Sequence, residues 1–150
     1  MSHPKTTTVS TSNKSSKDIL ARAMAQEDIF VEHSASAETA AFDVQNRRLI
    51  LPVWESMDDA MYDMLVGHEV SHALNTPADG WQEFVGTGPK SSVRHMFVNV
   101  VEDARIERMI KAKFPGLRRD FFAAYKNLAE RDLFEIGDRD LSELPLIDRL

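Results

Sequence analysis

Two histidines and a glutamate lie close together near the middle of the chain, at His68, Glu69 and His72. Residues four apart share one face of a helix, so a helix here would bring both imidazole rings within reach of one metal ion. Imidazole is a preferred zinc ligand, and a glutamate beside two such ligands can act as general base toward zinc-bound water. The spacing therefore predicts a site for one Zn²⁺ ion, with His68 and His72 as ligands and Glu69 as the catalytic base.

A catalytic zinc ion usually has three protein ligands and one open coordination position. The chain has no cysteine, so the third ligand must be another histidine or an acid. We predict Glu102, because it follows His72 by 30 residues and lies in a largely apolar stretch, where an unpaired acid would be costly. Asp103 is the alternative ligand. Asp103 could instead accept the outer N–H of a ligating histidine, and Asn99, one turn earlier, could share that role.

Cleavage of a carbonyl compound also needs a hydrogen-bond donor for the negative charge that develops on oxygen. The candidate donors are His95, Arg105 and Tyr125. A simpler interpretation makes His95 an isolated surface side chain and pairs Arg105 with acids of its own helix. Under that interpretation Asp103, Arg105 and Glu107 form a solvent-facing cluster of salt bridges, and the two central histidines are ordinary hydrogen-bonded residues of a helix.

Helical periodicity dominates the second half of the chain. A helix capped by Ser56 and ending near Asn75 would carry the two histidines, with acids in its first turn, where the helix dipole favours them. Residues 78–90, with three glycines and a proline, are predicted to form a loop. A second helix is expected from Ser91 or Ser92 to about Lys113, and a third over 117–131.

The first half of the chain has strand patterns besides one short helix, expected over 17–26. Residues 28–33, 39–44 and 47–53 are the strand candidates. The turn at Gln45-Asn46 favours a hairpin of the last two, and Pro52 indicates that 47–53 is an edge strand. The predicted fold class is therefore α+β, mostly helical, with a small N-terminal sheet above the histidine helix.

The length of 150 residues suits one folded domain. Residues 1–16 are rich in Ser, Thr and Lys and are expected to be a disordered lead-in, so the domain would cover 17–150. Apolar side chains recur over 133–147, which indicates that this segment docks on a partner or that the natural protein continues beyond Leu150.

Charge and hydropathy argue against two classes of partner. The net charge of −6 gives the bulk surface no electrostatic attraction for nucleic acid. No apolar run approaches the ~18 residues that span a bilayer, and no apolar segment near the N-terminus fits a secretory signal. We therefore expect an intracellular protein with no nucleic-acid and no membrane partner.

The segment Leu65–Leu74, which reads Leu-Val-Gly-His-Glu-Val-Ser-His-Ala-Leu, resembles the active helix of the gluzincin-type (HExxH) zinc metallopeptidases. The resemblance implies a zincin-like fold, a peptide or protein substrate, and a downstream glutamate ligand, which Glu102 matches by position and type. It also implies an edge strand above the site that can pair with an extended peptide, here residues 47–53. The thermolysin-type spacing Glu-x-x-x-Asp is absent, because the fourth residue after Glu102 is Ile106.

A second resemblance lies further along the chain. Val101–Glu107 together with Tyr125–Leu128 is similar to the N-terminal region of CobT-like proteins, including versions encoded by tailed bacteriophages. Those proteins typically continue into a von Willebrand factor A domain and work beside MoxR-type AAA ATPases. The resemblance therefore implies such partners, and a location in the host cytoplasm or, for a phage protein, the virion.

These 150 residues contain no von Willebrand factor A domain, so the function of a chelatase subunit does not carry over to this chain. Two alternatives to a peptidase follow from the resemblance. One is a non-catalytic, zinc-binding docking or regulatory module of a CobT-like assembly. The other is a metal site that only holds the fold together, in a phage particle or assembly complex.

Overall fold

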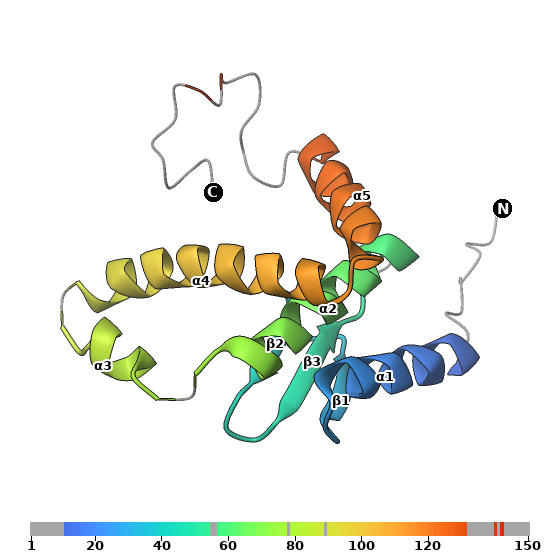
Figure 1. The fold of residues 1–150 in the computed structure, drawn as a ribbon, viewed down its shortest axis with the longest axis horizontal. Coiled ribbons are helices and arrows are strands. Elements are labelled where there is room, and N and C mark those ends of the chain that lie inside the picture. Colours follow the sequence, from blue (N-terminus) through green and yellow to red (C-terminus); the bar gives the residue numbers. More distant parts are fainter. Residues whose placement is uncertain are drawn as a thin grey trace, which may run out of the picture.

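The computed structural model of the chain describes residues 11–54, 57–77, 79–88, 90–131, 140 and 142. These residues form five helices and a three-stranded sheet, which confirms the predicted α+β class (Figure 1). The helices are α1 (Thr11–Ala25), α2 (Asp59–Asn75), α3 (Trp81–Val85), α4 (Ser91–Lys113) and α5 (Leu117–Glu130), and the strands are β1 (Phe30–Ser34), β2 (Ala41–Asp43) and β3 (Arg48–Pro52).

The sheet has the strand order β1-β3-β2, with β3 parallel to β1 and antiparallel to β2. The predicted hairpin is confirmed, and its turn is held by Asp43, whose carboxylate accepts the backbone N–H groups of Gln45 and Asn46. The prediction that 47–53 is an edge strand is wrong, because β3 is central. Pro52, which has no N–H to donate, is tolerated there because it is the last residue of the strand.

Helix α2 begins at Asp59 because Asp58 caps it, with a side chain that accepts the N–H of Met61 at 2.8 Å. The predicted cap, Ser56, lies outside the described residues. The helix ends where Pro77 follows Thr76. Gly67 lets α5 lie close to α2, since a Cβ atom at this position would meet the side chain of Phe121 at 3.2 Å.

Helices α4 and α5 match the predicted ranges closely and pack on α2. Ile106 and Ile110 of α4 and Phe121 of α5 are buried, whereas the N-terminal half of α4 is mostly exposed. The loop prediction for 78–90 is wrong in part, because it contains α3, which lies beside the start of α4 (Figure 1).

The ends of the chain qualify two further predictions. Helix α1 begins at Thr11, so the expected disordered lead-in extends too far, and residues 1–10 lie outside the described residues. The apolar segment 133–147 also lies outside them. Within the described part of the chain, none of the helices combines the length and the apolar character needed to cross a membrane.

Candidate metal centre

Helices α2 and α4 bring two imidazole rings and one carboxylate together. The Nε2 atom of His72 lies 3.2 Å from Oδ1 of Asp103, and Nε2 of His68 lies 3.6 Å from the same oxygen. The potential ligand atoms of these residues all lie within 4.8 Å of one another. Two ligands of a tetrahedral zinc ion, each ~2.0–2.1 Å from the metal, are about 3.3 Å apart. The two histidine–aspartate separations fall on either side of that value, so the three residues could hold a tetrahedral metal ion.

The other nitrogen of each ring has a partner of its own. Nδ1 of His68 lies 3.1 Å from Oε1 of Glu107, and Nδ1 of His72 lies 2.8 Å from Oγ1 of Thr76. Such outer hydrogen bonds orient metal-binding histidines and fix their tautomers. Both Nε2 atoms are thereby directed toward Asp103, the arrangement that metal binding through Nε2 requires.

Glu107 is a buried acceptor for three donors. Its Oε1 accepts from His68 and from the hydroxyl of Tyr125, and its Oε2 accepts from Lys111 at 3.0 Å. Burial alone would raise the pKa of Glu107, but the hydrogen bonds from His68, Tyr125 and Lys111 outweigh it and lower the pKa. Glu107 therefore stays ionised although only 9% of its side chain is exposed.

The cluster without metal is held by ion pairs. Burial would lower the pKa of His68, but hydrogen bonds with Asp103 and Glu107 outweigh it and raise the pKa to about 10. Burial would likewise raise the pKa of Asp103, yet the hydrogen bonds from the two histidines lower it overall. Zinc ligands must be deprotonated, so a metal ion would take the place of protons on these rings.

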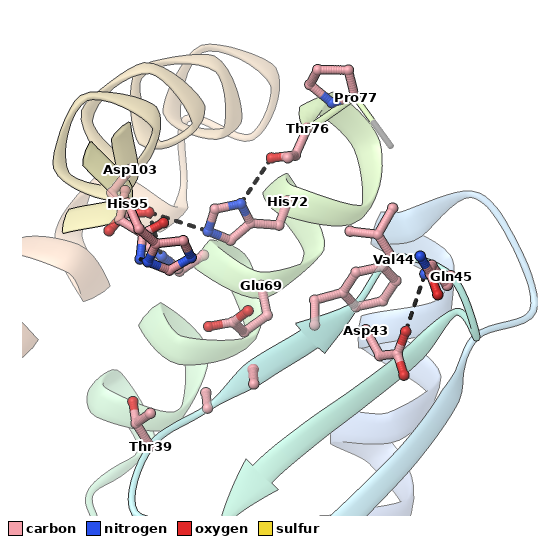
Figure 2. Close-up of a pocket in the computed structure, with 15 residues that line it drawn as sticks. Thr39, Asp43, Val44, Gln45, Glu69, His72, Thr76, Pro77, His95 and Asp103 are labelled. Atoms are coloured by element: carbon pink, nitrogen blue, oxygen red, sulfur yellow. Dashed lines mark hydrogen bonds and ion pairs between the residues drawn. The ribbon is translucent and has the colours of Figure 1, made fainter. Parts of the chain in front are cut away.

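Glu69 lies next to this cluster without being part of it. It is buried in α2, with 7% exposed, and Figure 2 draws its carboxylate between α2 and β2. Burial raises its pKa, opposed by the charges of His68 and His72 and by a hydrogen bond from the backbone of Phe42. A carboxylate with a raised pKa is a stronger base, which suits proton transfer near neutral pH.

The cluster opens into a cleft of about 680 Å³ (Figure 2). One wall is β2 with its flanking residues, 39–45, and the opposite wall is α4. Three α4 side chains that are four residues apart line it: His95, Asn99 and Asp103. The cleft is thus bounded by an edge strand, the histidine helix and one face of α4.

The predicted third ligand, Glu102, does not face the histidines. Its Oε1 accepts the hydroxyl of Thr76 at 2.6 Å, and both of its oxygens accept from Arg105 at 2.7 Å. The structure instead places the alternative, Asp103, against His68 and His72. Adjacent residues of a helix point about 100° apart, so only one of the two acids can face α2 with its carboxylate toward the rings.

The remaining predicted residues are divided between the cleft and its surroundings. Of the three candidate oxyanion donors, only His95 lines the cleft. Arg105 is bound to Glu102 and to the carbonyl oxygen of Asn75, and Tyr125 donates to Glu107. Asn99, expected beside a ligand, lies in the cleft wall with its amide nitrogen 3.4 Å from Nδ1 of His95.

Sequence reasoning missed two residues of the site, Glu107 and Thr76. A signal for Glu107 was present, because it follows Asp103 by four residues and therefore shares its face of the helix. The spacing is Asp-x-x-x-Glu. The aspartate faces the Nε2 atoms of the histidines, and the glutamate accepts from Nδ1 of His68. The same spacing marks Thr76, which follows His72 by four residues and caps the end of α2 with its backbone N–H bonded to the carbonyl oxygen of His72.

Comparison of the chain with models of known protein families, with curated proteins and with solved structures found no match. The likeness to gluzincins and to CobT-like proteins therefore rests on the quoted sequence segments.

Proposed function

We propose that this protein is a zinc-dependent peptidase domain in which His68, His72 and Asp103 bind one Zn²⁺ ion. The main support is the convergence of two Nε2 atoms on one carboxylate, while both Nδ1 atoms are engaged by outer partners. Three protein ligands leave a fourth position for water or substrate, as in catalytic rather than structural zinc sites. Glu69, buried beside the ligands but not among them, is the general base.

A zinc ion at this position would supply Lewis acidity, lowering the pKa of a bound water toward ~7. Glu69 is placed to accept a proton from the attacking water as the water oxygen bonds to the carbonyl carbon. The protonated carboxyl group then returns the proton to the amine nitrogen as the C–N bond breaks. His95, in the α4 wall of the cleft, is the candidate donor to the carbonyl oxygen.

The choice of a peptide as substrate is supported by the strand beside the site. Among the described strands, β2 pairs only with β3, so no further strand covers its other edge, and an extended chain could bind beside the contact that Phe42 makes there with Glu69. The hydrogen bond between the backbone of Phe42 and the carboxylate of Glu69 places that edge against the proposed base. A peptide added to β2 would therefore pass the catalytic carboxylate.

Metal analysis and a cleavage assay together test the proposal. Purified wild-type protein should contain one zinc per chain and cleave a fluorescently labelled unfolded protein. Glu69→Gln should keep the zinc and lose cleavage, whereas His72→Ala and Asp103→Ala should lose both. A wild-type protein that binds no zinc would refute the metal site, and cleavage that persists in Glu69→Gln would refute the role of the base.

One further outcome decides between the peptidase and a non-catalytic module. Zinc bound tightly through the same three residues, with no cleavage of any peptide or unfolded protein, would contradict the peptidase. It would favour the docking or regulatory module of a CobT-like assembly. A pull-down against a von Willebrand factor A domain and a MoxR-type ATPase would then be the next measurement.

A further inference from the structure

We propose that Glu102 is a positioning residue that acts through Thr76 to hold His72 in the tautomer that can bind a metal through Nε2. The inference rests on the proposed metal site and deepens it. It assigns a role to a buried carboxylate that faces away from the proposed ligand atoms. The role follows from the direction of each hydrogen bond in a short series that runs from Arg105 to His72.

The series of hydrogen bonds begins at Arg105. Its guanidinium donates to both oxygens of Glu102 at 2.7 Å and to the carbonyl oxygen of Asn75 at 2.8 Å. A carboxylate in such an ion pair is ionised and can only accept hydrogen bonds. The hydroxyl of Thr76, 2.6 Å from Oε1 of Glu102, must therefore donate its single proton to that oxygen.

With its proton committed, the hydroxyl of Thr76 can only accept from its other neighbour. That neighbour is Nδ1 of His72, at 2.8 Å. Nδ1 must therefore carry a hydrogen, and in the neutral ring the lone pair lies on Nε2. Nε2 is the atom that faces Asp103 at 3.2 Å, where the metal would bind.

Loss of Glu102 would release this constraint. Thr76 could then donate to Nδ1 of His72, and the ring proton would move to Nε2, where Asp103 would accept it. A metal ion could then bind Nε2 only after the hydrogen had left that nitrogen, and its affinity would be lower. His68 needs no such relay, because Nδ1 of His68 faces the carboxylate of Glu107 directly.

The first test measures zinc affinity by competition with a chelator. Glu102→Ala and Thr76→Val should each weaken zinc binding by roughly 10- to 100-fold, the range for partners of metal-binding histidines. Thr76→Ser keeps the hydroxyl and should bind like wild type. Because Glu102 acts through Thr76, the double variant should bind no more weakly than Thr76→Val alone. A further full loss in the double variant would overturn the inference.

The second test needs no metal. The ¹⁵N chemical shifts of the His72 ring, recorded by NMR on metal-free protein at alkaline pH, distinguish the two neutral tautomers. Every protein in this test also carries Asp103→Ala, which removes the acceptor that faces Nε2 of His72 at 3.2 Å. Hydrogen on Nδ1 is expected in the Asp103→Ala parent and with Thr76→Ser, and a shift toward Nε2 with Glu102→Ala. An unchanged tautomer in Glu102→Ala would overturn the inference. Absence of zinc from wild type would refute the proposed function instead, while the NMR result would still decide the role of Glu102.

Discussion

Replacing Glu107 by alanine should destabilise the metal-free protein strongly, because this one carboxylate satisfies several donors at once. Oε1 accepts from both His68 and Tyr125, and Oε2 accepts from Lys111. The side chain of His68 is only 17% exposed, so its Nδ1–H would lose its partner with little access to water. Lys111, with 31% of its side chain exposed, can turn into solvent.

The size of the effect follows from these partners. Removing one partner of a buried ion pair typically costs about 3–5 kcal/mol, and we expect a loss in the lower part of that range because Lys111 can rehydrate. Glu107→Gln keeps an oxygen in the place of Oε1 but removes the negative charge that pairs with His68 and Lys111, so it should lose about 2 kcal/mol, the range for a hydrogen bond to a charged group. Tyr125→Phe removes one donor only and should lose about 1 kcal/mol.

Urea unfolding followed by circular dichroism, with a chelator present, measures the three free energies of unfolding without any contribution from metal. The expected order of destabilisation is Glu107→Ala above Glu107→Gln, and Glu107→Gln above Tyr125→Phe. Equal losses for alanine and glutamine at position 107 would refute the reasoning, since they would mean that the acceptor at Oε1 contributes nothing to folding.

Three further changes probe the fold and its electrostatics. Gly67→Val should lower the free energy of unfolding by about 2 kcal/mol or more through overpacking against Phe121; Gly67→Ala is the smaller control, and a neutral valine variant in urea unfolding would contradict the close helix contact. Asp58→Ala removes the N-cap of α2 and should cost about 1 kcal/mol in the same assay, whereas Asp58→Asn should be nearly neutral; equal losses would argue against a capping role. The pKa of His68 is raised to about 10 in the metal-free fold, so the stability it contributes is complete below its unfolded pKa of ~6.5 and is lost as the pH rises toward 10. Unfolding in chelator at a series of pH values should show this fall, and Asp103→Asn should flatten it; a wild-type profile that is flat over this range would contradict the raised pKa.

The elements with strong local signals were predictable from the sequence. Phe114-Pro115-Gly116 marks the end of α4, and the turn at Gln45-Asn46 marks the β2–β3 hairpin. The position of β3 in the sheet was not predictable in this way. It depends on a parallel pairing with β1, in which Phe30 lies opposite Arg48, and no local pattern specifies a partner so distant in sequence.

The candidate site was predictable in part for a similar reason. His68, Glu69 and His72 lie on one helix, so their spacing alone brings them together. The third ligand depends on how α4 is rotated about its axis when it packs on α2. Buried Ile106 and Ile110 lie four and eight residues after Glu102, so the three share one buried face of α4, and on that face Glu102 meets Thr76 at the end of α2 and not the two histidine rings. The spacing of Asp103 and Glu107 was the better guide to the face of α4 that meets the histidines.

The two walls of the cleft belong to separate parts of the fold. The proposed ligands and their outer partners come from α2, α4 and α5 together with Thr76, whereas residues 39–45 of the hairpin form the wall opposite α4. Changes in the length or composition of the hairpin would therefore alter what fits in the cleft without replacing any of the three proposed ligands. For the proposed peptidase, replacement of this single short segment would be the change expected to alter substrate specificity.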